Sequence, residues 1–106
     1  MSNEIRIRAA HRQGITDLRV LIRHPMETGN RKDSGGRNIP EHFIRTVTLR
    51  LNGVLLTRLH WGPGVSRDPL FGMRLQQARP GDRIEVLWID NLGNQGSETA
   101  VVAEQK

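Results

Sequence analysis

The sequence predicts an all-β protein, and two features of the chain lead to that prediction. Apolar residues recur at every second position in short runs, which is the period of a half-buried strand. Turn-forming groups such as Asn52-Gly53 and Arg79-Pro80-Gly81-Asp82 separate these runs. Roughly seven short strands at near-regular spacing, without a convincing amphipathic helix, are typical of an immunoglobulin-like β-sandwich with antiparallel strands.

The first two strands alternate apolar residues with arginine or aspartate. Residues 5–9 begin this pattern as Ile-Arg-Ile-Arg-Ala. In the next run Leu18, Val20 and Ile22 share one face, while Asp17 and Arg19 point the other way. We therefore expect each of these strands to bury one face and to leave the other in solvent.

The third and fourth strands are predicted to form a hairpin. Phe43, Val47, Leu49 and Leu51 are expected to share the buried face of the third strand. Asn52-Gly53 then suits a type I′ turn, because both of its central residues need a positive φ. The return strand covers residues 54–60 and ends where Trp61-Gly62-Pro63-Gly64 prevents regular pairing.

Three further strands are expected, over residues 70–75, 84–89 and 98–103. A short helix is the alternative at residues 70–75. In the sixth strand Ile84, Val86 and Trp88 alternate, but Leu87 and Ile89 make the opposite face apolar as well. Such a strand either lies under a loop at its end or contributes to a partner interface.

Composition limits the chemistry of the chain. Its 106 residues suit one domain, residues 1–106, and the absence of cysteine excludes disulfides, thiolate metal ligands and cysteine nucleophiles. The four histidines, at positions 11, 24, 42 and 60, lack metal-ligand spacing, and no phosphate loop is present. We therefore expect no metal, no cofactor and no catalytic residues.

Charge leaves a second class of partner open. A formal net charge of +5 permits an anionic partner, including nucleic acid. The arginines are scattered, however, and the few aromatic residues are not interleaved with them as base stacking requires. Arginine-solvated strand faces are the simpler interpretation.

The most specific motif is the run His24-Pro25-Met26-Glu27-Thr28-Gly29, which ends the second strand and opens a polar loop, residues 30–38. Glu27 and His24 could act as an acid–base pair. The alternative is structural: the His-Pro step ends the strand, Glu27 and Thr28 bond neighbouring backbone, and Gly29 supplies a positive φ.

This run resembles the SoxZ family of sulfur-oxidation proteins, and the resemblance extends over nearly the whole chain. The other matching segments are Ile5 to Ala9, Val20 to Ile22, Arg31-Lys32-Asp33, Gly36, Ile39-Pro40, Ile44, Trp61-Gly62-Pro63, Val65-Ser66, Asp68-Pro69-Leu70, Gly81-Asp82, Val86-Leu87-Trp88, Asp90-Asn91 and Gly93.

The resemblance implies a non-catalytic subunit that pairs with SoxY, whose C-terminal Gly-Gly-Cys-Gly-Gly arm carries the sulfur intermediate of thiosulfate oxidation. It also implies transient contacts with other Sox enzymes and a periplasmic location reached by export with the partner, since residues 1–6 contain no signal-like apolar segment. The residues expected to recognise the partner are His24, Pro25, Met26, Glu27, Thr28, Gly29, Arg31, Lys32, Asp33, Trp61, Leu87, Ile89, Asp90 and Asn91.

Several alternatives stay open beside this expectation. Arg31, Lys32 and Arg37 could stabilise the anionic sulfur adduct through charge-assisted hydrogen bonds. The isolated chain could also form a homodimer through its unpaired interface. From other functional classes, an accessory binding module for another protein or polyanion and an enzyme that uses Glu27 and His24 are the rivals.

Overall fold

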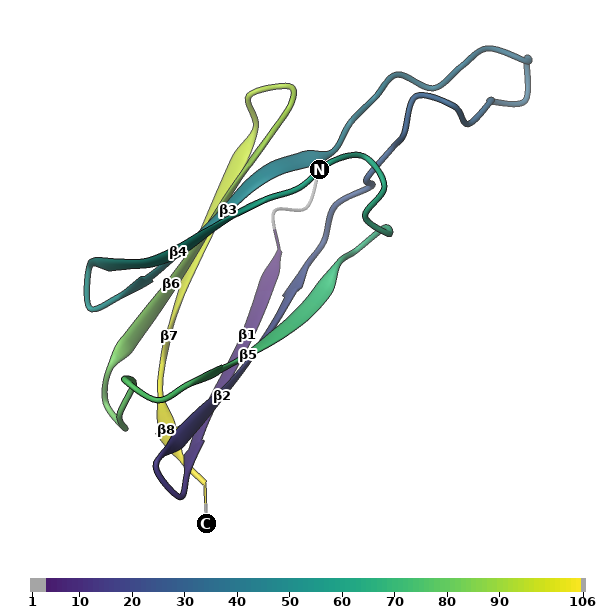
Figure 1. Ribbon diagram of the computed structural model, residues 1–106. Coiled ribbons are helices and arrows are strands. Elements are labelled where there is room, and N and C mark those ends of the chain that lie inside the picture. Colours follow the sequence, from purple (N-terminus) through teal and green to yellow (C-terminus); the bar gives the residue numbers. More distant parts are fainter. Residues whose placement is uncertain (1–3, 106) are drawn as a thin grey trace.

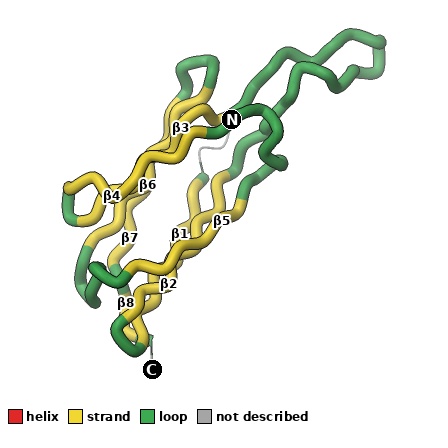
Figure 2. Tube along the Cα trace, viewed as in Figure 1, coloured by secondary structure: helices red, strands yellow, loops and turns green. Residues whose placement is uncertain are grey.

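The computed structural model describes residues 4–105, and its strands form two packed sheets (Figures 1 and 2). One sheet has the strand order β5-β2-β1-β8, and the other has the order β4-β3-β6-β7. The strands are β1 (Ile5–Arg12), β2 (Ile15–Ile22), β3 (Ile44–Leu51), β4 (Val54–His60), β5 (Leu70–Leu75), β6 (Arg83–Asp90), β7 (Gln95–Val101) and β8 (Ala103–Glu104).

These two sheets confirm the predicted immunoglobulin-like β-sandwich. Residues 70–75 form strand β5, which pairs antiparallel with β2, so the alternative of a short helix there is wrong. Asn52 and Gly53 have φ values of 51° and 82°, as the predicted β3–β4 turn requires. No helix within residues 4–105 is long and apolar enough to cross a membrane. Residues 1–3, which belong to the segment without a signal-like pattern, lie outside the described residues.

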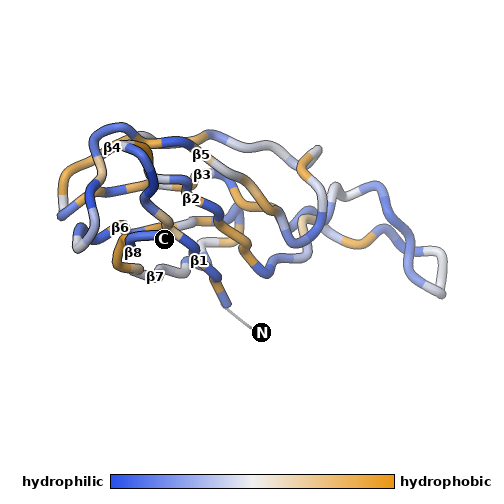
Figure 3. Tube along the Cα trace, turned by 90° about the horizontal axis from the view of Figure 1, so that it is seen from below, coloured by the Kyte–Doolittle hydropathy of each residue, from blue (hydrophilic) through white to orange (hydrophobic). Residues whose placement is uncertain are grey.

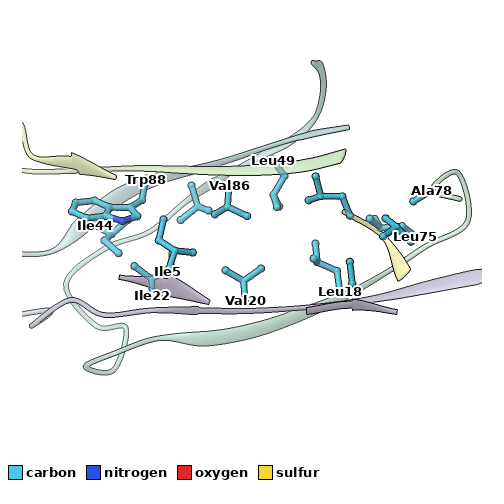
Figure 4. Close-up of a cluster of buried hydrophobic side chains, with 14 of the residues drawn as sticks. Ile5, Leu18, Val20, Ile22, Ile44, Leu49, Leu75, Ala78, Val86 and Trp88 are labelled. Carbon is cyan, nitrogen blue, oxygen red and sulfur yellow. The ribbon is translucent and has the colours of Figure 1, made fainter. Parts of the chain in front are cut away.

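The hydrophobic core lies between the two sheets (Figure 4). Leu18, Val20 and Ile22 of β2 face the buried side chains of β3 and β6 across this interior, and all three are fully buried. The largest fully buried side chain is that of Trp88. Burying a large aromatic side chain removes much apolar surface from water, so Trp88 dominates the core at the end of the sandwich where β6 finishes.

The buried face of β3 differs from the prediction at its first residues. The register between β3 and β6 shifts between Ile44 and Thr46, which is the signature of a β-bulge. Because the bulge adds one residue, Ile44 takes the fully buried position and Phe43 is only half-buried. Strict alternation from Val47 backwards assigns that position to Phe43.

The C-terminal strand also differs from the prediction. Strand β7 begins at Gln95 and ends at Val101, whereas residues 98–103 were expected to form one strand. Val102 is buried and exchanges backbone hydrogen bonds with the 81–82 turn. The chain then crosses to the other sheet, where β8 pairs parallel with β1. Sequence alternation continues through this crossing, so it could not locate the change of sheet.

A long loop between β2 and β3, residues 23–43, projects from one end of the sandwich and is called the projecting loop below (Figure 1). It helps to give the molecule an elongated form of 53 × 25 × 21 Å. Its outer part is mostly hydrophilic (Figure 3), and residues 30–38 are all exposed. The end of β6 lies at the base of this loop, which places the predicted site residues at one end of the molecule.

Candidate partner-recognition site

The projecting loop is held as two antiparallel legs. Near its base, Glu27 and His42 exchange backbone hydrogen bonds of 2.6 and 3.0 Å. Farther out, the Ile39 amide donates to the Arg31 carbonyl at 2.7 Å, and the Asp33 amide donates to the Arg37 carbonyl at 2.8 Å. These bonds satisfy backbone groups that would otherwise depend on water alone. The loop therefore has a defined shape along its length.

A buried carboxylate supports the base of the projecting loop. Asp90 is 2% exposed and lies at the end of β6. Its Oδ2 atom accepts hydrogen bonds from Nε2 of His42 at 2.7 Å and from Nε2 of His24 at 3.0 Å. The backbone amides of Leu92 and Asn94 donate to Oδ1, and the Asn94 side-chain amide donates to Oδ2. One carboxylate thus connects both legs of the loop to the β6–β7 turn.

The tautomer of His24 follows from its backbone contact. Nδ1 of His24 lies 3.1 Å from the amide nitrogen of Met26, which can only donate. Nδ1 is therefore the acceptor, and Nε2 carries the proton that His24 donates to Asp90. The imidazole is 3% exposed and also packs edge-on against Trp88, with ring centroids 5.2 Å apart.

This arrangement sets the charge states of Asp90 and His24. Burial alone raises the pKa of Asp90, but hydrogen bonds from His24, His42 and Asn94 outweigh it and lower its pKa to about 2. Burial lowers the pKa of His24, and the hydrogen bond to Asp90 opposes that shift without cancelling it. A neutral imidazole and an ionised carboxylate therefore face each other at neutral pH.

Three other predicted residues complete the support of the loop. Asn91 binds the second leg: its Oδ1 accepts from the Phe43 amide at 2.9 Å, and its side-chain amide donates to the Glu41 carbonyl. Met26, which is 5% exposed and has φ of 50°, accepts the Ile44 amide at its sulfur. Pro25, between His24 and Met26 in the sequence, is half-buried. Asn91 and Met26, with His24 and Asp90, thus shape the loop from inside, whereas Pro25 lines a surface hollow.

The accessible part of the predicted site lies farther along the loop. Thr28, Arg31, Lys32 and Asp33 are exposed, and Gly29 is half-buried with φ of 88°. An added Cβ at Gly29 would lie 2.8 Å from the Cγ atom of Glu41, so the legs approach closely there. The exposed residues of the loop therefore present the largest area to a partner while the loop keeps this shape.

Glu27 and His24 are both engaged in other contacts. Nε and an Nη atom of Arg31 donate to the Glu27 carboxylate, with the shortest distance at 2.7 Å. The hydrogen bond from Arg31 lowers the pKa of Glu27. Because His24 has both ring nitrogens bonded to Met26 and Asp90, neither group is free to exchange a proton with a substrate. This geometry supports the structural interpretation of the His24–Gly29 run, except that the Glu27 carboxylate binds the Arg31 side chain and not the neighbouring backbone.

The remaining predicted residues lie on the outer face of β6 and beside it. Leu87 is half-buried and Ile89 is 39% exposed, whereas Ile84, Val86 and Trp88 are buried as predicted. Ile89 and Trp61 line a hollow of about 590 Å³ together with Arg45, Thr46, His60 and Asp90. An apolar strip therefore runs along β6 toward the base of the projecting loop.

Sequence spacing gave no sign that His24, His42 and Asp90 form a cluster. The side-chain atoms that could bind a metal lie within 4.8 Å of one another, which is close enough for all three to contact one ion. Both Nε2 atoms, however, point at the same carboxylate oxygen at hydrogen-bond distance, and Nδ1 of His24 is used by Met26. A metal would have to displace protons that these bonds require. The donor set fits a hydrogen-bonded support and does not fit a metal site.

The fold and this site define a β-sandwich domain with a projecting loop whose two legs are hydrogen-bonded to each other. Residues 5–101 match the sequence model of the family described as Sulphur oxidation protein SoxZ. The chain belongs to the SoxZ family and is thus a sulfur-oxidation protein, as the His24–Gly29 run indicates.

Two solved structures with a similar fold are of superoxide reductase. A variant of Superoxide reductase (Neelaredoxin) from Ignicoccus hospitalis is similar with a TM-score of 0.63 and 17% identity, covering 97% of this chain and 81% of that chain. A second structure, Superoxide reductase (Neelaredoxin) from Ignicoccus hospitalis, has a TM-score of 0.56 and 19% identity, with coverage of 95% and 80%. At such identities the likeness concerns the fold alone. No curated protein sequence matches the chain significantly.

Proposed function

We propose that this chain is the non-catalytic subunit of a sulfur-carrier complex, in which it binds SoxY and helps to present the cysteine-bound sulfur intermediate to partner enzymes. Membership of the SoxZ family supports the pathway. The chain contains no cysteine, so it cannot hold the sulfur covalently itself. The thiol must then come from the partner.

The observation that carries this proposal is the apolar strip on the outer face of β6. Exposed apolar side chains that lie together beside polar neighbours are typical of protein interfaces. Leu87 lies opposite Thr48 on β3 and Ser97 on β7, and Ile89 lies opposite Thr46 and Gln95. Gln95 and Ser97 are small to medium polar residues and are exposed, so they leave the strip open to a partner on the β7 side.

The projecting loop supplies the second part of the surface. It leaves the sandwich at the end where β6 finishes, so a partner on Leu87 and Ile89 lies near the loop base (Figure 1). Lys32 and Arg37 are exposed and form no ion pair among the described residues, whereas Arg31 already binds Glu27. In this proposal Lys32 and Arg37 are the freer cations for an anionic adduct.

In the same proposal the complex operates in the periplasm, which this chain reaches by export with SoxY.

Leu87→Asp tests the proposed interface. We expect it to weaken binding to SoxY at least about tenfold, since a carboxylate buried against an apolar partner remains unpaired. Ile89→Asp should act in the same direction, and it disturbs the fold less because Ile89 is 39% exposed. Isothermal titration calorimetry with purified SoxY measures the affinity, and thermal unfolding checks that each variant is folded.

Val54→Asp is the matched control for these variants. Val54 is 68% exposed and begins β4, at the end of the sandwich opposite the projecting loop. It gains the same charge on an exposed apolar position outside the proposed surface. Equal affinities for wild type, Leu87→Asp and Ile89→Asp would remove β6 from the interface, and so would an equal loss in Val54→Asp.

A further inference from the structure

The outer face of the β5-β2-β1-β8 sheet carries a concentration of arginine, and it is distinct from the strip on β6. Alternation places the buried apolar residues of β1 and β2 inward and the charged residues of these strands outward. The exposed arginines of this outer face, called the arginine face below, are Arg6, Arg8, Arg12, Arg19 and Arg74. Only two of the sixteen basic residues of the chain are lysines.

Two of these arginines lie directly opposite each other. Arg8 of β1 and Arg19 of β2 are register partners in the antiparallel pair. Like charges at directly opposed positions destabilise a sheet. Asp17 offsets Arg19 only partly, at 3.6 Å and with both side chains well exposed. Within residues 4–105, Arg8, Arg12 and Arg74 form no ion pair.

On the outer face of the other sheet, an arginine has an acidic partner. There Arg50 of β3 bonds Glu85 of β6 at 3.0 Å, across directly opposed positions. A surface of mixed positive and negative side chains keeps a protein as soluble as a surface of positive side chains alone. Neither stability nor solubility therefore explains why Arg8 and Arg19 lie directly opposite each other. Binding of an anionic partner explains it.

The shape and composition of the arginine face favour an acidic protein over a nucleic acid. Two neighbouring hollows, of about 290 and 420 Å³, share Asp17 and Arg19. Exposed Leu70 and Ile15 stand at its margins and suit contact with a protein. Asp17 interrupts the positive charge at the centre of this face. Separate carboxylates can bind on either side of Asp17, whereas a continuous phosphate backbone would have to pass over it. Phe71, the one aromatic residue of β5, packs toward the core, so it offers no stacking platform.

We infer that the arginine face is a docking surface for an acidic protein, independent of the SoxY surface and open while that partner is bound. Guanidinium groups bind carboxylates through two parallel hydrogen bonds, which lysine cannot do. Attraction of this kind speeds association and weakens as salt rises, which suits a transient partner. The inference does not depend on the identity of the protein at β6.

Binding of poly-L-glutamate to the ¹⁵N-labelled full chain tests this inference. We expect amide shifts on β1, β2 and β5 at low salt that vanish above about 0.3 M salt. Arg8→Glu/Arg19→Glu should weaken binding at least about tenfold. The matched control Arg58→Glu/Arg83→Glu makes the same change of charge at exposed positions of β4 and β6 on the other sheet, and it should stay within about threefold of wild type.

The single variant Arg8→Glu adds a readout that loss of folding cannot imitate. It places opposite charges in register with Arg19, so the melting temperature should rise by about 2 to 4 °C while binding of poly-L-glutamate weakens. Undiminished binding by this variant would overturn the inference, as would shifts confined to the projecting loop. If Arg8→Glu/Arg19→Glu lowers the affinity for duplex DNA by a larger factor than the affinity for poly-L-glutamate, the assignment of the partner as a protein is overturned.

Discussion

Asp90→Asn lowers the free energy of unfolding by about 3 kcal/mol, as expected for a buried carboxylate whose partners lose their acceptor. The asparagine amide must place its NH₂ group either toward the two imidazole Nε2 atoms or toward the amides of Leu92 and Asn94. Donor then faces donor in either orientation. His24 cannot relieve this by changing tautomer, because Met26 occupies Nδ1. Urea unfolding at pH 7 measures the loss.

Asp33→Asn is the control for that substitution. Asp33 is exposed, and its Oδ1 accepts the amides of Gly35 and Arg37 in the tip of the projecting loop. An asparagine oxygen can accept both bonds, so stability should change by less than about 0.5 kcal/mol. A cost at Asp90 as small as that at Asp33 would show that the Asp90 network does not hold the base of the loop.

The same carboxylate makes stability depend on pH. Its pKa falls from 3.8 to about 2 on folding, so its contribution is complete above about pH 5 and is lost as the pH falls from there to about 2. The amount is about 2 kcal/mol. His24, whose pKa is also lowered, costs stability as the pH falls below 6.5, since the unfolded chain then binds a proton that the folded chain refuses. Asp90→Asn should abolish the loss of stability that protonation of Asp90 causes, which urea unfolding between pH 2 and 5 measures.

Gly96→Ala is expected to destabilise the protein by about 2 kcal/mol, the cost of forcing an extra carbon into a packed core. A Cβ on Gly96 would lie 2.7 Å from Nε1 of Trp88 and 2.9 Å from Cε2. Trp88 is 1% exposed, so its indole cannot move aside into solvent. Because the ring packs on His24, the displacement should reach the base of the loop and alter tryptophan fluorescence.

Gly64→Ala provides the comparison for Gly96→Ala. Gly64 is exposed, and an added Cβ there meets no atom within 4 Å. We expect a change of less than about 0.5 kcal/mol, or a slight gain from the reduced freedom of the unfolded chain. Thermal unfolding followed by circular dichroism compares the two variants. Equal stability of both would mean that β7 does not press against Trp88.

Local patterns were sufficient to predict most of the sandwich. The period of two placed Val20, Val86 and Trp88 in the core because each strand buries one face, and Asn52-Gly53 specified its hairpin through its φ requirement. The bulge before Thr46 and the crossing at Val102 were not predictable in this way. Both depend on how a strand pairs with distant partners, which alternation does not record.

Sequence and resemblance named several residues that meet at the base of the projecting loop, but not the structural role that each plays there. The resemblance identified His24, Met26, Asp90 and Asn91. The first three are buried and Asn91 is hydrogen-bonded to the second leg, so these side chains support the loop from inside. His42 was missed, since 18 positions separate it from His24 and no spacing rule joins them. Topology provides the absent signal: the end of β2, the start of β3 and the end of β6 meet at one end of the sandwich.

Native mass spectrometry of this chain purified with SoxY, before and after exposure to thiosulfate, tests the proposed carrier function most directly. The proposed carrier function predicts a one-to-one heterodimer in which the added sulfur mass resides on the SoxY cysteine and none resides on this chain. A homodimer of this chain that excludes SoxY would contradict this function. Turnover of thiosulfate by this chain alone would contradict it as well, because the hydrogen bonds of Glu27 and His24 leave neither residue free for chemistry.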